Sequence, residues 1–184
     1  MPRKSNKREK LLEAARQLFH SQGFANTTLS DIAIGSGVPL GNVYYYFKTK
    51  QDLVLAVVSQ KCDEYKMLFE NWEKDEPRVR MGHYLELYES RVELIANHGC
   101  PDGVLSIELN KDNPALSQQA DTILSLQLDW ISRQFSEIGR NDSRKLALHM
   151  MTSLQGSSLL SASLSDKSIL LDEVKRLKGL IKKV

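Results

Sequence analysis

Three polar side chains in one short segment have the chemistry to contact duplex DNA. Asn42, Tyr44 and Tyr45 follow Pro39, which suits the first turn of a helix and predicts a short helix over 39–46. If the residues on the other face of this helix, three positions apart, are buried, these three side chains point outward. An Asn amide can pair with an adenine edge in the major groove, and a Tyr hydroxyl can bond a phosphate. The pattern therefore predicts a DNA-contacting helix.

A second short helix is expected just before it, because a DNA-reading helix needs a partner that fixes its angle. Thr28 can cap a helix over 29–35, and Gly37 then breaks it. Ala33 supplies the small residue where the two helices cross. The positions predicted to lock the pair from inside are Ile32, Val38, Val43 and Tyr46.

The rest of the chain is also predicted to be helical, because apolar residues recur at intervals of three and four and Pro is scarce. The fold class is therefore all-α: an N-terminal three-helix DNA-binding domain over 1–50, joined by a long helix to a helical domain over 51–184. A loop is expected over 98–103, where Gly and Pro cluster. The remaining helices are expected at 6–22, 50–74, 79–97, 104–109, 115–138, 143–164 and 169–182.

Charge is distributed unevenly along the 184 residues. The net charge is +2, but residues 1–50 carry eight Lys/Arg against three Asp/Glu. A basic front end favours an anionic partner for this segment. No apolar run is long enough for a bilayer, and no apolar stretch of a secretory signal follows the basic N-terminus. With only two cysteines, the composition fits a reducing compartment and predicts a cytoplasmic protein.

A run of matches across the first fifty residues resembles the TetR family of bacterial transcriptional regulators. The matching residues are Gly23-Phe24, Thr27-Thr28-Leu29, Asp31-Ile32-Ala33, Gly37-Val38, Tyr44-Tyr45-Tyr46-Phe47-Lys48 and Lys50. The resemblance implies an all-helical homodimer that binds a near-palindromic DNA operator. It also implies a C-terminal domain that binds a small-molecule inducer, here expected to be apolar or aromatic, whose binding releases the DNA.

The resemblance also assigns DNA contacts residue by residue. The family's contact positions correspond here to Thr27, Thr28, Pro39, Leu40, Asn42, Tyr44, Tyr45 and Lys50. Many family members have Lys where this chain has Leu40, and Leu cannot bond a phosphate or a guanine. Tyr46 and Phe47 are expected to belong to the core. The basic tail, with Arg3 and Lys4, either reaches the DNA backbone or only aids solubility.

The C-terminal part is less informative. Residues that could line a ligand cavity are Met67, Tyr84, Tyr88, Cys100, Trp130 and His149, and each could equally be plain core. Small residues in Gln155-Gly156-Ser157-Ser158, together with the amphipathic helix over 169–182, suggest a four-helix dimer interface or an intramolecular packing face. Cys100, expected in an open loop beside His98, could make the chain a thiol-based sensor repressor, or could be an inert packing residue.

Three other classes fit the sequence poorly. An enzyme using Cys100 with a His would lack any nucleophile elbow, Gly-rich phosphate loop or carboxylate pair, so no catalytic residue and no cofactor is expected. The spacing of Cys62, His83, His98 and Cys100 does not match a structural metal site, so no metal is expected. A nonspecific nucleoid-type binder is disfavoured by the nearly neutral total charge. Sequence-selective binding would distinguish a regulator from it.

Overall fold

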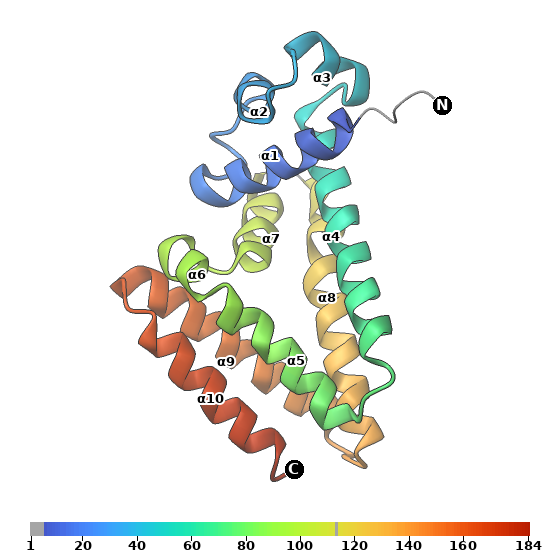
Figure 1. The fold of residues 1–184 in the computed structure, drawn as a ribbon, viewed down its shortest axis with the longest axis vertical. Helices are drawn as coiled ribbons and strands as arrows, with labels where there is room; N and C mark the ends of the chain where they lie inside the picture. Colours follow the sequence, from blue (N-terminus) through green and yellow to red (C-terminus); the bar gives the residue numbers. More distant parts are fainter. Residues whose placement is uncertain (1–5, 113) are drawn as a thin grey trace. The chain divides into compact units, whose positions relative to one another are not determined.

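The computed structural model describes residues 6–112 and 114–184, and the regular structure in this part of the chain consists of helices, without strands. Figure 1 shows the helices in order along the chain. They are α1 (Lys7–Gln22), α2 (Leu29–Ser36), α3 (Leu40–Tyr46), α4 (Lys50–Trp72), α5 (Pro77–Ser90), α6 (Val92–His98), α7 (Pro101–Asp112), α8 (Pro114–Glu137), α9 (Ser143–Leu164) and α10 (Ser168–Ile181). No helix in the described segments combines the length and apolar character needed to cross a membrane. The all-α prediction is confirmed.

The chain divides into two compact units. The first contains the described residues up to Cys62 together with Val104–Ile123, and the second contains Asp63–Gly103 and Leu124–Val184. Each candidate site described below lies within one unit. The sequence-based division at residue 50 stays a prediction.

Apolar residues of α1, α2 and α3 form the core of the first unit. Leu11, Ala15, Ile32 and Val43 are completely buried, because the three-and-four spacing of α1 presents one face to α2, which in turn packs against α3. Phe47 is also buried, as predicted, whereas Tyr46 is half-exposed.

The turn between α1 and α2 is fixed by residues distant in sequence. Gly23 has φ +89°, a backbone conformation that favours glycine, and a Cβ there would lie 2.6 Å from Glu108 Oε1. The Phe24 amide donates to Glu108 Oε2 at 2.5 Å. From the other side, the Lys50 ammonium donates to the carbonyls of Phe24 (2.7 Å) and Ala25 (3.2 Å). The turn is thus held by a carboxylate and an ammonium that bond its backbone.

In the second unit, α9 packs against both α6 and α10, and α10 packs against α5. The buried face of α10 repeats at helical spacing, with Leu170, Val174, Leu177 and Ile181. Ser158 and Ser161 are also buried, and the Ser161 hydroxyl accepts from the Leu170 amide at 3.1 Å. Ser158 and Ser161 therefore serve packing within the chain, whereas a dimer interface on this helix stays a prediction.

Two helix boundaries differ from the prediction. The single helix expected over 79–97 is broken at Arg91, which has φ −110° and ψ 11°. No Gly or Pro marks this break, so local sequence could not reveal it. The loop expected over 98–103 is shorter, because Pro101 occupies the first turn of α7, where its missing N–H costs no hydrogen bond.

Candidate functional site

The pair α2–α3 forms a helix-turn-helix whose ends are fixed by local hydrogen bonds. At the start of α2, the Asp31 amide donates to Thr28 Oγ1 and the Thr28 amide donates to Asp31 Oδ2, a reciprocal capping box. The Asp31 carboxylate accepts hydrogen bonds from the Thr28 hydroxyl at 2.7 Å and from the Thr28 amide, and these two bonds lower the pKa of the Asp31 carboxyl. At the other end, Gly37 adopts φ +65°, and its amide bonds the carbonyls of Ala33 and Ile34. The predicted tight turn is therefore present.

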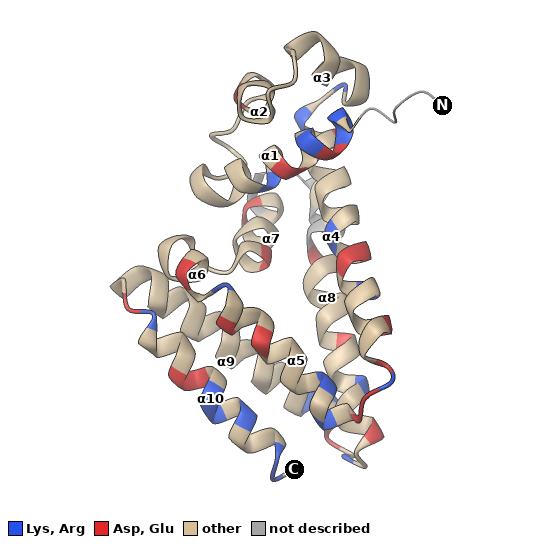
Figure 2. Ribbon diagram, viewed as in Figure 1, with Lys and Arg blue, Asp and Glu red and all other residues tan. Residues whose placement is uncertain are grey.

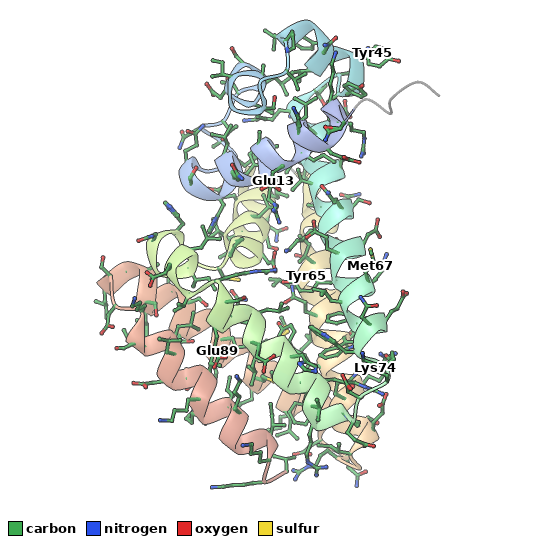
Figure 3. The ribbon with its side chains drawn as sticks, viewed as in Figure 1. Glu13, Tyr45, Tyr65, Met67, Lys74 and Glu89 are labelled. Carbon is green, nitrogen blue, oxygen red and sulfur yellow. The ribbon has the colours of Figure 1, made fainter. Side chains whose placement is uncertain are left out.

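Helix α3 presents an uncharged, partly aromatic surface to solvent. The exposed fractions are 75% for Tyr45, 49% for Tyr44 and 39% for Leu40, and Asn42 is half-exposed. Val43 lies on the opposite, buried face. Figure 3 shows Tyr45 projecting away from the helices of its unit. An amide and two phenol hydroxyls on one exposed helix face can reach base edges and phosphates at the same time.

Positive charge lies beside α3 and not on it. Figure 2 shows Lys and Arg at the start of α1 and in the segment that joins α3 to α4. Lys48 is exposed in that segment, and the Arg8 guanidinium lies 5.6 Å from the centre of the Phe47 ring. Sequence reasoning did not single out Lys48 as a contact, although a basic residue next to the predicted helix was a usable signal. Arg3 and Lys4 lie outside the described residues.

Two of the predicted DNA contacts have other roles in the structure. Thr27 is completely buried, and its hydroxyl donates to the Gly23 carbonyl at 2.7 Å, so the expectation of a side-chain contact with DNA is wrong. Lys50 was expected to contact a phosphate, but its ammonium bonds two backbone carbonyls and lies 4.4 Å from the centre of the Phe24 ring. Thr28 and Pro39 remain exposed at the starts of α2 and α3.

Aromatic rings cluster inside the second unit, and three of the predicted ligand residues belong to this cluster. The Tyr84 ring lies 5.8 Å from Tyr88 and 5.9 Å from Trp130, measured between centroids. Trp130 also stacks on Phe69 at 4.2 Å with an interplanar angle of 10°. We define the aromatic cluster as Tyr65, Phe69, Trp72, Tyr84, Tyr88 and Trp130. All of its rings are buried except Trp72, which is half-exposed.

A hydrogen-bonded chain passes through the aromatic cluster. Tyr65 Oη donates to Asp102 Oδ2 at 2.5 Å, and Gln127 Nε2 donates to the same oxygen at 3.2 Å. Gln127 Oε1 in turn accepts from Tyr84 Oη at 2.7 Å. Gln155 Nε2 donates to Tyr88 Oη at 3.3 Å. Asp102 and Gln127 were missed, although Gln127 interrupts an apolar stripe of its helix, which was a usable signal.

Burial is the largest influence on the pKa values of the tyrosines in this hydrogen-bonded network. It raises the pKa of the Tyr65, Tyr84 and Tyr88 hydroxyls, so all three stay neutral donors. The Asp102 carboxylate raises the Tyr65 pKa further. Arg91 faces this carboxylate: burial lowers the pKa of its guanidinium, but its interactions with the Tyr65 side chain and with Asp102 outweigh burial, and the pKa is raised overall.

Three predicted ligand-site residues do not match their expected surroundings. Met67 is 63% exposed and His149 is exposed, so neither can line a cavity inside the unit. Figure 3 shows that Met67 and Tyr65 leave α4 on different sides. Cys100, expected in an open loop, is buried, and burial followed by the charge of Asp102 raises the pKa of its thiol. The expectation of an accessible, activated thiol is therefore wrong.

Comparison with known proteins agrees with the geometry of the first unit. Residues 11–57 match the family model described as bacterial regulatory proteins, tetR family. A helix-turn-helix transcriptional regulator from the lacX 3′ region of Lactococcus lactis is 28% identical over 97% of this chain and 95% of its own length.

Solved structures share the fold along nearly the whole chain. A TetR regulator from Legionella pneumophila covers all of this chain with 98% of its own, at a TM-score of 0.82 and 19% identity. FadR from Bacillus subtilis, solved with stearoyl-CoA, covers 94% of this chain with 96% of its own, at a TM-score of 0.73 and 21% identity. At such identities the structural likeness establishes the fold. The family match identifies residues 11–57 as the DNA-binding domain of TetR-family transcriptional regulators, and the structural likeness shows that the chain has the fold of these proteins.

Proposed function

We propose that this regulator is a repressor that recognises a specific operator with the exposed face of α3. The observation that carries the proposal is the exposure of Tyr44 and Tyr45, together with a half-exposed Asn42, on a helix whose other face is buried. Large aromatic side chains exposed together on a short helix usually have a partner. Asn42 reads a base edge, and the two Tyr hydroxyls bond the DNA backbone.

The neighbouring residues position this helix on the DNA. Leu40 offers an apolar contact, which favours a thymine methyl over a guanine. Thr28 and Pro39, at the starts of α2 and α3, approach the backbone. Thr27 has no place in this interface because it is buried. We assign Lys50 to holding the turn at Phe24, and Lys48 to a phosphate.

The active form is a homodimer on a near-palindromic site, because one short helix buries too little surface for tight binding. Apolar side chains on α9 of the second unit support this: Leu160 is 50% exposed and Leu159 is 65% exposed. Gly156 is exposed on the same helix, with no atom within 4 Å of a Cβ built there, so a second helix could approach closely. Two recognition helices then bind half-sites about one helical turn of 10–10.5 bp apart or somewhat more.

Sedimentation tests the dimer and its interface together. The parent should sediment as a dimer with and without a duplex. Leu160→Glu should give monomers and lose DNA affinity, because it places a charge in an apolar interface. Leu94→Glu is the matched control, since Leu94 is 45% exposed on α6 of the same unit, and it should remain dimeric. A parent that is monomeric in both conditions contradicts the proposal.

A small, mostly apolar or aromatic inducer binds at the aromatic cluster and releases the operator. Ligand sites are typically lined by aromatic side chains with a few convergent polar groups, and the aromatic cluster has both. FadR has a similar fold and was solved with stearoyl-CoA, which supports a small-molecule ligand for this chain. The two binding equilibria are linked, so if the inducer weakens operator binding by some factor, operator DNA must weaken inducer binding by the same factor. A compound with equal affinity for free and DNA-bound protein is therefore not the inducer.

A thiol-sensing repressor is the less favoured alternative. Cys100 is 6% exposed, and burial raises its pKa, so the reactive thiolate is disfavoured. A noncovalent inducer needs no such thiolate.

A further inference from the structure

One donor in the aromatic cluster is buried without an acceptor. Trp130 is 5% exposed, and within the described part of the chain its Nε1 atom has no hydrogen-bond partner. Burying an unpaired N–H is unfavourable, so buried polar groups in native proteins are nearly always bonded. The neighbouring polar groups Gln127 and Tyr84 are already bonded to each other. The indole N–H is therefore available to an acceptor from outside the chain.

The rings around this donor define the shape of such a partner. Phe69 and Tyr84, both buried, lie 4.2 Å and 5.9 Å from Trp130 between centroids. The third neighbour, Trp72, lies 5.7 Å away and is half-exposed. Trp72 is thus the ring that can move aside most easily to admit a molecule. Flat rings packed around a flat ring select a planar aromatic partner.

The charged groups beside the aromatic cluster favour a partner without a net charge. The buried Asp102 carboxylate is not an unmatched charge, because it accepts hydrogen bonds from Tyr65 and Gln127 and faces Arg91. Arg91 also lies near a second carboxylate, Glu64. A cation would have to compete with Arg91 for these carboxylates, and an anion would meet Asp102. A neutral partner avoids both costs.

We propose that Trp130 Nε1 is the specificity-determining donor for the inducer, which is a neutral, planar aromatic compound carrying a hydrogen-bond acceptor. This inference rests on the proposed inducer site at the aromatic cluster. It adds the chemical class of the ligand and the atom that selects it.

The test uses three probes of nearly equal shape. Quinoline has a ring-nitrogen acceptor, naphthalene has none, and N-methylquinolinium has its nitrogen blocked and charged. At a pH where quinoline is neutral, it should bind about five- to tenfold more tightly than naphthalene, the worth of one net hydrogen bond. N-methylquinolinium should bind more weakly than quinoline. Equal affinities for quinoline and naphthalene, or no binding by any probe, would overturn the proposal.

NMR of the two indole N–H groups reports the bond directly, because the chain contains only two Trp. Quinoline should move the Trp130 resonance in the direction of hydrogen bonding, and naphthalene should not. Trp130→Phe assigns that resonance and should abolish the preference for quinoline, whereas Trp72→Phe should keep it. If Trp130→Phe does not fold, the comparison of the probes on the parent still decides. A quinoline-induced shift confined to Trp72 would overturn the proposal.

Failure of the inference and failure of the proposed function are distinguishable. If quinoline bonds Trp130 but leaves operator affinity unchanged, the ligand class stands and the inducer role of the site fails. If the probes bind without discrimination, yet another ligand of the cluster releases the operator, the inducer role stands and the donor assignment fails.

Discussion

Replacing Lys50 separates a structural role from a phosphate contact. The Lys50 ammonium donates to the carbonyls of Phe24 and Ala25, at 2.7 and 3.2 Å, and lies over the Phe24 ring. Lys50→Met keeps most of the aliphatic stem and removes both bonds. Hydrogen bonds to charged groups contribute about 1.5–3 kcal/mol each, but Lys50 is half-exposed. Solvent screening reduces the expected loss in unfolding free energy to about 1–2 kcal/mol in total.

The assay pairs urea unfolding with the salt dependence of DNA binding. Lys50→Met should unfold at lower urea and leave the slope of log K against log salt unchanged, because its charge is committed to the turn. Lys48→Met is the matched control two residues away, because Lys48 is exposed and makes no hydrogen bond to the turn within the described residues. It should unfold like the parent and lower the slope by about 0.9. If Lys50→Met unfolds like the parent and lowers the slope instead, Lys50 contacts a phosphate and our reasoning is refuted.

Three further predictions concern the two sites. Asn42→Ala should lose about 1–3 kcal/mol of discrimination at one base pair, and unchanged selectivity in competition binding would contradict base reading. Tyr65→Phe should lower the unfolding free energy by about 1–3 kcal/mol, because it removes a buried bond to a carboxylate, whereas the exposed Tyr45→Phe should not; equal urea midpoints would count against this. A thiol reagent should modify half-exposed Cys62 before buried Cys100, as mass spectrometry can follow, and the reverse order would revive the thiol sensor.

Local signals in the sequence were sufficient to predict the first three helices and the turn between α2 and α3. The helix over 6–22 was predicted from its apolar spacing, and the structure has α1 over nearly the same residues because one face of it packs on α2. Thr28 and Gly37 act within a few residues of themselves, as a cap and as a left-handed turn, so their roles could be read from sequence. The sequence could not show that Thr27 is buried while Thr28 is exposed, since the burial of Thr27 depends on how the chain folds back around Gly23.

Long-range packing decided the features that were missed. The apolar spacing of a helix shows that a stripe exists but not which neighbour covers it, so Met67 was expected inside and is exposed. The bond between Tyr65 and Asp102 joins residues 37 positions apart, and no local pattern indicates it. Cys100 was expected to be open because Gly99 and Pro101 flank it, but Pro101 begins a helix and Cys100 is buried. Contacts distant in sequence thus explain most of the errors.

The central claim, sequence-specific recognition by α3, is tested most directly by selecting duplexes from a random pool and measuring equilibrium binding at fixed salt. The selected sites should share a near-palindromic sequence and bind at least about 10³-fold more tightly than scrambled duplexes of the same length. Asn42→Ala should reduce that margin, whereas Lys175→Ala, an exposed charge on α10 of the other unit, should preserve it. A pool that yields no shared sequence, or equal affinity for selected and scrambled duplexes, would contradict the account.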